Sequence, residues 1–455
     1  MARPIQRTRT RRSRVGVGVL ALVMGASLLP LTSVAAAEPQ DVVLDWNLNA
    51  VQVLSNLATG TPPGAGLAPG PAAIHLAMVQ GAIYDAVNAI DGGHAPYLSG
   101  LPSAPSTASK GAAAAKAAHD VLVGVLPQVV PALPATLITT IDANLDVLYD
   151  ASITEILNAG VPQADINAGV TIGAATATRM LAARVGDGRF VFAQFSPGTG
   201  IGQWRVEPPT GNDPNAWVFN VTPFTLASPD QFATDGPYAI DSNLYLKDFN
   251  EVKSMGGSVL TGSNRTDAQT QEALFYSINP FPMENAALRD VATARGLSNT
   301  QSARLLAMSS FSAADGLIGC WVDKHAWSFW RPITAIREAA NDGNDKTQPY
   351  SGPNTAGWLP LLTTPPYPDQ PSGYNCFTAA MMNAAKRYFD SNEATFTLRN
   401  VNGARTYDTF TSVLKDTIDA RVWLGIHFRK ADVDGAGLGE NVAKWVSKNF
   451  FQPVP

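Results

Sequence analysis

An aromatic-rich run from Cys320 to Pro332 contains two cations, Lys324 and Arg331, seven positions apart. Because burying an unpaired charge is costly, cations in such a run indicate an anion that holds them there. If the run is helical, the spacing is close to two turns and both side chains can face one site. Arginine binds oxyanions through its planar fork, and lysine supplies a point charge. The alternative interpretation is a pair of interhelical ion pairs.

The segment Pro371-Ser372-Gly373 can add backbone donors for the same anion. Helix-forming residues follow it, so Ser372 is suited to cap a helix and Gly373 to let a ligand approach the backbone. Free amides at a helix N-terminus, with the helix dipole behind them, bind tetrahedral oxyanions. Taken alone, the segment is better explained as a plain capped helix after a proline-rich loop.

A third segment contains Arg421 and His427, which are six positions apart and do not share a face of a straight helix. Gly425 lies between them, so we expect the helix to end there and to place His427 beside Arg421. A neutral imidazole can bind a metal or attack phosphorus. The alternative is a core histidine whose ring is satisfied by a backbone carbonyl.

The elements that must position these residues are helices. Apolar residues at three-to-four spacing cover residues 41–57, 72–90, 112–126, 137–159, 163–185, 241–254, 266–277, 284–295, 300–318, 331–341, 372–389, 407–424 and 434–449. No series of strands with period-two alternation is present. We therefore predict an all-α fold of two helical bundles, residues 38–185 and 241–455, joined by a long irregular connection at 186–240.

The first 37 residues have the pattern of a cleaved signal peptide. Six arginines lie within the first fourteen residues, an apolar stretch follows, and Ala35-Ala36-Ala37 provides a small-residue cleavage site. Thr10-Arg11-Arg12 also fits the twin-arginine export route. We therefore expect a protein that is secreted or held in the bacterial cell envelope.

Removal of these six arginines leaves 26 basic residues against 37 acidic ones, a formal charge of −11. An acidic chain is a poor candidate for binding nucleic acid or anionic membranes. We predict no membrane span in the remaining chain. Nothing in the sequence indicates the oligomeric state.

Two cysteines flank the motif segments. Cys320 lies four residues before Lys324, and Cys376 lies three residues after Gly373. An oxidising compartment favours a disulfide between them. The alternative is two buried free thiols.

Together the three segments resemble a known signature. Lys324-x6-Arg331-Pro332, then Pro371-Ser372-Gly373, then Arg421-x5-His427 is similar in order and spacing to vanadium-dependent haloperoxidases and the related type 2 phosphatidic acid phosphatases. The helical N-terminal half and the export signal resemble bacterial secreted members of the haloperoxidase branch. The resemblance implies the all-α fold of the vanadium haloperoxidase and acid phosphatase type.

The resemblance also implies a vanadate cofactor, whose site phosphate can occupy. Lys324, Arg331 and Arg421 would hold the equatorial oxygens. Ser372 and the amide of Gly373 would add hydrogen bonds, and His427 would bind vanadium axially. The implied catalytic residues are Lys324, His427 and the residue after Gly373. The aromatic residues implied on the halide side are Trp321 and Tyr367.

The implied reaction is the oxidation of a halide by hydrogen peroxide, with a small organic substrate as the halogen acceptor. The alternative is an acid phosphatase that uses His427 as its nucleophile. One pocket can serve both reactions because five-coordinate vanadate resembles the arrangement reached in phosphoryl transfer.

Tyr374 departs from the family pattern, which has an acid/base histidine after Ser-Gly. An ordinary tyrosine has a pKa near ~10 and is a poor base at neutral pH. We expect the three neighbouring cations to lower its pKa. His325 is a weak substitute, because consecutive residues usually face different directions. A second alternative is therefore an oxyanion-binding protein whose catalysis has lapsed.

Overall fold

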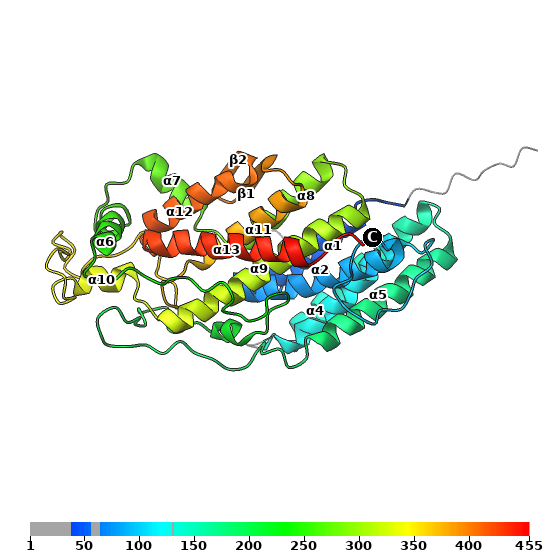
Figure 1. Cartoon of the computed structure of the whole chain (residues 1–455), viewed down its shortest axis with the longest axis horizontal. Coiled ribbons are helices and arrows are strands. Elements are labelled where there is room, and N and C mark those ends of the chain that lie inside the picture. Colours follow the sequence, from blue (N-terminus) through cyan, green and yellow to red (C-terminus); the bar gives the residue numbers. More distant parts are fainter. Residues whose placement is uncertain (1–37, 56–63, 130–131, 455) are drawn as a thin grey trace, which may run out of the picture. The chain divides into compact units, whose positions relative to one another are not determined.

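The computed structural model describes residues 38–55, 64–129 and 132–454. The predicted signal peptide therefore lies outside the described residues, as does Leu57, the predicted end of the first helix. In the described part the chain is almost entirely helical, which confirms the all-α prediction (Figure 1). The first helices are α1 (Val42–Ser55), α2 (Pro69–Asp91), α3 (Lys110–Val125), α4 (Ala135–Asn158) and α5 (Gln163–Ala183), with a 3-10 turn η1 (Leu126–Gln128) after α3.

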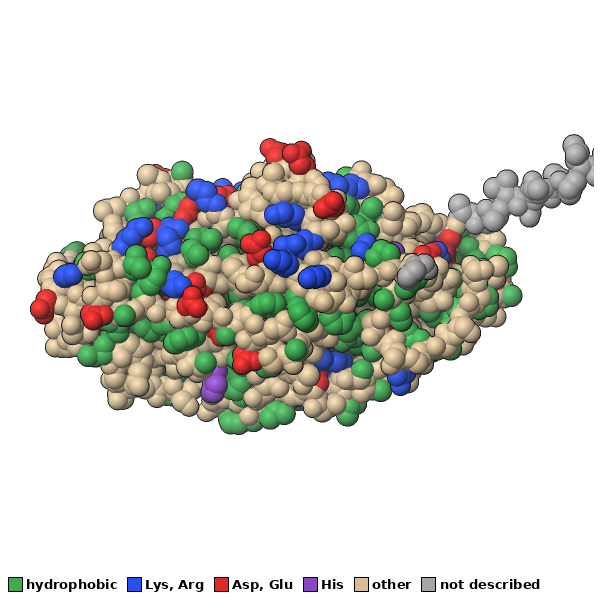
Figure 2. All heavy atoms as spheres, viewed as in Figure 1, with side chains coloured by type: hydrophobic (Ala, Val, Ile, Leu, Met, Phe, Trp, Pro, Cys, Tyr) green, Lys and Arg blue, Asp and Glu red, His purple; other side chains and the backbone are tan. Residues whose placement is uncertain are grey.

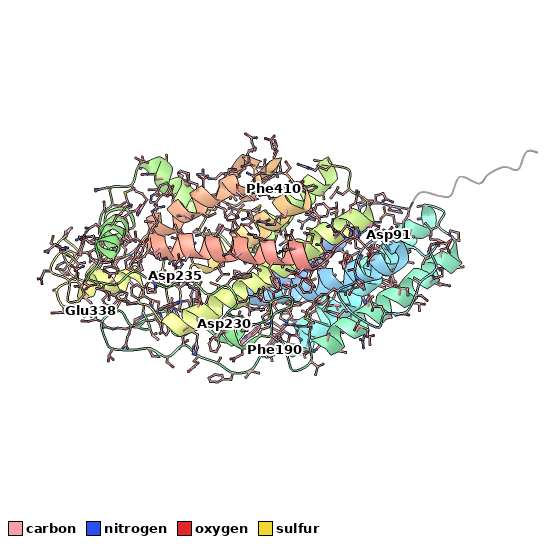
Figure 3. All side chains as sticks on the ribbon, viewed as in Figure 1. Asp91, Phe190, Asp230, Asp235, Glu338 and Phe410 are labelled. Carbon is pink, nitrogen blue, oxygen red and sulfur yellow. The ribbon has the colours of Figure 1, made fainter. Side chains whose placement is uncertain are left out.

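The second half of the chain contains the predicted helices and one element that the sequence did not predict. The elements are η2 (Ala216–Asn220), α6 (Asn243–Met255), α7 (Asp267–Phe275), α8 (Pro280–Ala294), α9 (Asn299–Trp327), α10 (Pro332–Glu338), α11 (Gly373–Tyr388), β1 (Glu393–Asn400), β2 (Gly403–Thr409), η3 (Phe410–Ser412), α12 (Val413–Trp423) and α13 (Arg429–Asn449). The long connection at 186–240 contains η2 as its one regular element among the described residues. Figure 3 labels Phe190, Asp230 and Asp235 along it.

The antiparallel hairpin of β1 and β2 corrects two predictions, the absence of strands and the start of one helix. It occupies the start of the helix predicted at 407–424, so α12 begins only at Val413. The strand alternates as a half-buried strand should, since Phe396 and Leu398 are buried while Thr395 is exposed. Phe396 pairs with Tyr407 across the ladder. The period-two signal was present, but it covers only one short hairpin.

The long helix α9 lies at the centre of the hydrophobic core, where α2, α11 and α13 pack against it (Figure 1). Two glycines let α13 approach α11 closely. A side chain at Gly435 would place its Cβ 2.6 Å from the carbonyl oxygen of Ser372, and one at Gly439 would place it 2.4 Å from that of Cys376. The predicted division into two bundles stays a prediction, although α2 and α9, from its two sides, share one core.

Helix α9 bears on the prediction of no membrane span. By length and composition alone it is long and apolar enough to cross a bilayer, a property that the sequence analysis did not assign to any segment after residue 37. In the structure 94% of its apolar window is buried inside the protein. This is the environment of a core helix, which here positions a site at its C-terminal end.

Candidate functional site

Lys324 lies in the last turn of α9 and is fully buried. Its Nζ donates to the backbone oxygens of Pro368 (2.8 Å) and Asp369 (3.0 Å). The ammonium lies 5.0 Å from the centre of the Tyr367 ring. Burial, together with the charge of nearby Arg331, lowers the pKa of Lys324 to about 8. The amine can therefore exist in either protonation state near neutral pH.

Arg331 lies in the same site as Lys324, but it is not on the same helix, as the sequence analysis had considered. Helix α9 ends at Trp327, Ser328 takes the left-handed conformation, and Arg331 becomes the N-cap of α10. Its Nε donates to the Tyr367 carbonyl at 2.8 Å, and its Nη1 donates to the Ile426 carbonyl at 2.7 Å. Its Nη2 is buried without a hydrogen-bond partner among the described residues. The seven-residue spacing therefore brings both cations to one loop without one continuous helix.

Ser372 is the N-cap residue of α11, as predicted, but its side chain does not cap the helix. The buried hydroxyl faces the Asp432 carboxylate without a hydrogen bond of acceptable geometry. Next to it, a side chain at Gly373 would place its Cβ 2.8 Å from the indole of Trp321. The space beside Gly373 is thus filled by Trp321, which packs onto the start of the helix.

His427 follows the end of α12, where Gly425 has a φ of 78°. This left-handed residue ends the helix where the sequence predicted. The Nδ1 of His427 lies 2.8 Å from Oδ1 of Asp369, and Nη1 of Arg331 lies 3.1 Å from its Nε2. If the proton is on Nδ1, which faces this carboxylate, the lone pair is on Nε2, which faces Nη1 of Arg331. Arg331, rather than Arg421, is therefore the arginine in contact with the ring.

Arg421 lies in the last turn of α12 and is 6% exposed. Its Nη1 donates to the Tyr276 carbonyl at 3.1 Å, and its guanidinium lies 4.9 Å from the centre of the Tyr374 ring. Its Nε is buried without a hydrogen-bond partner among the described residues. Like Arg331, it therefore has donor capacity that the surrounding protein does not use.

A cavity of about 290 Å³ joins these segments. The predicted site residues that line it are Trp321, Tyr367, Gly373, Tyr374, Arg421 and His427. Lys324, Arg331 and Ser372 are fully buried and do not line it. We call Lys324, Arg331, Ser372, Arg421 and His427 the cradle. Its buried cations contrast with the protein surface, where basic and acidic side chains are interspersed on the face shown in Figure 2.

Comparisons with known proteins agree with this architecture. The family model described as the VCPO second helical-bundle domain matches residues 304–454, which include every residue of the cradle. Vanadium chloroperoxidase of Curvularia inaequalis is 25% identical over 161 residues, covering 31% of this chain and 26% of that protein. The chain thus matches about a quarter of the length of this relative.

Solved structures match over almost the whole chain. A bacterial vanadium-dependent iodoperoxidase aligns with a TM-score of 0.69 and 18% identity, covering 91% of this chain and 97% of that one. A holo-type bacterial vanadium-dependent chloroperoxidase aligns with a TM-score of 0.64 and 17% identity over the same shares. The chain has the vanadium haloperoxidase fold. At these identities the structural likeness establishes the shared fold.

Tyr374 is where this chain departs from the expected motif, and its pKa differs from the prediction. Burial raises the pKa of Tyr374 well above its ordinary value, and the nearby Glu284 carboxyl adds to this effect. Arg421 opposes the shift without reversing it. The prediction that the cations lower this pKa is therefore wrong, because desolvation outweighs them. The phenol keeps its proton, and its hydroxyl has no hydrogen-bond partner among the described residues.

His325 does not take over the missing histidine's position. It is exposed, and its ring stacks on Phe219 with 4.3 Å between ring centroids. A second ring of the 186–240 connection, that of Phe195, lies 6.4 Å from it between ring centroids. The structure therefore places no second imidazole from this segment in the cradle.

Sequence reasoning missed two carboxylates that lie in the site. Asp369 is 1% exposed and pairs with His427, and burial raises its pKa to about 7 while Arg331 and Lys324 oppose the shift. Asp432, in the first turn of α13, is fully buried and accepts a 2.9 Å hydrogen bond from Asn375. A signal for Asp369 existed, since it stands three residues before Ser372. Asp432 gave none, because its proximity depends on the packing of α13 on α11.

Both cysteines are buried free thiols in the described structure, so the second of the two sequence interpretations applies. The Cys320 thiol lies 3.6 Å from the carbonyl oxygen of Pro371. Burial and the neighbouring Cys320 raise the pKa of Cys376 well above its ordinary value. The two motif segments are thus held together by packing, without a covalent link.

Proposed function

We propose that the protein is a vanadate-binding haloperoxidase that uses hydrogen peroxide to oxidise a halide, which then halogenates a small organic substrate. The observation that carries this proposal is the cradle. Three buried cations from two separate segments converge beside one neutral histidine, and two of their donors have no partner among the described residues. Buried donors normally find a partner, so unused ones on the cavity wall, as in Arg421, or buried behind it, as in Arg331, indicate a ligand that supplies acceptors.

The donor set fits vanadate. Arg331 Nη2, Arg421 Nε and the Ser372 hydroxyl are buried without partners among the described residues, and they would hold the oxygens of an oxyanion. The pKa of His427 is lowered well below its ordinary value by burial and by the three cations, so the ring is neutral. Its Nε2, which faces Nη1 of Arg331 at 3.1 Å, would bind the metal in place of that contact. Bound vanadate would supply the Lewis acid that activates peroxide.

Residues of this chain would control the protons of the reaction. Lys324, with a pKa of about 8, can hold or release a proton near neutral pH. Tyr374 lines the cavity and can donate a hydrogen bond or a proton from its hydroxyl, but it is a poor base. We therefore expect slower turnover than a histidine at this position would support.

The proposed test titrates the full mature chain with vanadate and measures the oxidation of bromide and iodide by peroxide with a dye acceptor. We expect vanadate to bind and the Tyr374→His variant to gain activity. Tyr388→His, the same change at the far end of α11, is the matched control and should gain none. Failure to bind vanadate would refute the assignment of the cradle, whereas binding without any gain would refute the role given to Tyr374.

A second candidate is an acid phosphatase with His427 as nucleophile. The pairing of Asp369 with Nδ1 of His427 favours it, because a carboxylate in this position orients a nucleophilic imidazole through the other nitrogen. Hydrolysis of a phosphate ester that vanadate inhibits, without peroxide-dependent activity, would support this function over the first. Vanadate binding with neither activity would indicate an oxyanion-binding protein whose catalysis has lapsed.

We further propose that residues 1–37 direct export, so that the mature protein acts outside the bacterial cytoplasm or in the cell envelope. The support is the arginine-rich start, the apolar stretch and the small-residue site before Glu38. N-terminal sequencing of the protein recovered from the culture medium tests this proposal. A mature N-terminus at Glu38 is the expected result, and an uncleaved chain in the cytoplasm would contradict it.

A further inference from the structure

Asp213 is a carboxylate in the wall of the cavity that the sequence analysis did not single out. It lies in the 186–240 connection just before η2, and it is 5% exposed. Its Oδ1 accepts a 2.8 Å hydrogen bond from the backbone amide of Asn215. Its Oδ2 accepts a 3.1 Å hydrogen bond from Nε1 of Trp321. The side chain is therefore fixed from two directions at the edge of the cavity.

The hydrogen bond to Asp213 determines what Trp321 can offer a ligand. An indole has one N–H and no acceptor, so the only donor of this side chain is already in use. The ring instead packs at 5.2 Å from Tyr367 and covers the start of α11 at Gly373. This wall of the cavity thus combines a carboxylate with the faces of two aromatic rings. The cavity-lining groups with free donor capacity, such as Arg421 and Tyr374, belong to α12 and α11.

A carboxylate in this wall acts unequally on different halides. Every halide loses water when it enters a cavity, and the cost of desolvation rises as the ion becomes smaller. Because the Trp321 N–H is already bound to Asp213, the indole returns none of that cost, and an ionised Asp213 adds repulsion. Iodide is the largest and least strongly hydrated of the three common halides, so its desolvation costs the least free energy. Desolvation of chloride costs the most.

We propose that Asp213 is a halide-selecting residue, which holds the Trp321 indole N–H and places a carboxylate in the cavity wall so that iodide is preferred to bromide and chloride. This inference rests on the proposed haloperoxidase function and names the substrate class of the same site. Asp213 acts partly through Trp321 and partly by its own charge. Selectivity, rather than the rate of the chemical step, is the quantity it controls.

The test compares Asp213→Asn with the wild-type full-length mature protein loaded with vanadate. Asparagine keeps the size and can still accept from Trp321, but it removes the charge. We expect the KM for bromide to fall roughly tenfold, while the KM and kcat for iodide change by less than about threefold. Asp230→Asn, an exposed residue of the same connection, is the matched control and should leave both values unchanged. Asp213→Glu keeps the charge and should keep the preference for iodide.

A second measurement does not depend on turnover. Line broadening of the bromide nucleus in NMR, on vanadate-loaded protein without peroxide, should show about tenfold tighter bromide binding in Asp213→Asn. If the wild type oxidises no halide, the proposed function fails, and this binding measurement still tests Asp213. Asp213→Ser is a second neutral variant in case Asn at this position prevents folding. An unchanged ratio of bromide to iodide affinity in a folded neutral variant would overturn the inference.

Discussion

The interface between α3 and α5 and the cradle are both buried, but they differ in packing and in polarity. Between α3 and α5 the backbones nearly touch. A side chain at Gly169 would place its Cβ 2.2 Å from the carbonyl oxygen of Ser109, and one at Gly173 would place it 2.4 Å from that of Ala113. At these contacts the two helices meet through glycine and alanine, and the interface has no space for a larger side chain.

The cradle has the reverse properties. Its cations are held by backbone carbonyls, and polar atoms of Arg331, Ser372 and Arg421 have no partner in the described structure. Buried polar atoms without partners cost free energy of folding. The close packing of α3 on α5 stabilises the fold, whereas the unpartnered polar atoms of the cradle destabilise it. This cost in folding free energy keeps donors available for a ligand. Substitutions in the two regions should therefore have opposite consequences for stability and for ligand binding.

The largest effect is expected in the helix pair. Gly169→Ala forces a methyl group against the backbone of α3, which can move only if the helices separate. We expect the free energy of unfolding to fall by roughly 3–5 kcal/mol, while vanadate affinity of the remaining folded protein stays unchanged. Urea denaturation measures the first quantity and vanadate titration the second.

The control for this substitution is Gly437→Ala. Gly437 lies within α13, and a Cβ there has nothing within 4 Å. Alanine should raise stability by about 0.5–1 kcal/mol, since it favours the helix and costs no contact. Equal effects of the two substitutions would show that α3 and α5 are not packed as closely as described.

Glu284 gives an intermediate effect and a dependence on pH. This carboxyl is fully buried on α8, and Thr378 donates a 2.5 Å hydrogen bond to its Oε1, while its Oε2 has no hydrogen-bond partner among the described residues. Burial raises its pKa to about 8 from an ordinary value of 4.5. The unfolded chain releases this proton near pH 4.5 and the folded chain only near pH 8. The stability associated with this group is thus fully present below 4.5 and is lost as pH rises through about 8.

Glu284→Gln removes that loss. Each pH unit between the two pKa values corresponds to about 1.4 kcal/mol. The difference of about 3.5 between the two pKa values therefore predicts that the variant is more stable than the wild type by up to roughly 5 kcal/mol near pH 8, and by almost nothing near pH 4.5. Urea denaturation at several pH values tests this, with the exposed Glu440→Gln as control. A difference between variant and wild type that does not change with pH would contradict the assignment.

The sequence predicted the parts of both regions that depend on local pattern. Periodicity located the helices of the N-terminal half, and motif spacing located Lys324, Arg331, Ser372, Arg421 and His427. The outcome for α9 shows the limit of this reasoning. Its last nine residues are dense in aromatic residues and charge, and only the surrounding core explains why they continue the helix to Trp327.

What the sequence did not predict depends on distant contacts or on burial. Asp213, Asp369 and Asp432 come from three segments that only tertiary packing brings to the cavity and the cradle. The pKa of Tyr374 was predicted with the wrong sign because the number of nearby cations can be counted from motifs, whereas desolvation cannot. Desolvation also distinguishes a helix interface, where every polar group has a partner, from a site with unused donors, and the sequence does not reveal it.

Ser372→Ala should have the smallest effect on stability, and it tests the difference between the helix interface and the cradle most directly. Its hydroxyl is buried and unpartnered, so removing it eliminates a polar group that the fold does not use. We expect the free energy of unfolding to change by less than about 0.5 kcal/mol, while vanadate affinity falls roughly tenfold through the loss of one hydrogen bond to the oxyanion. Ser447→Ala, near the far end of α13, should change neither quantity. If Ser372→Ala instead destabilises the fold and leaves vanadate affinity intact, the hydroxyl serves structure, and the cradle holds less capacity for a ligand than its unpartnered atoms indicate.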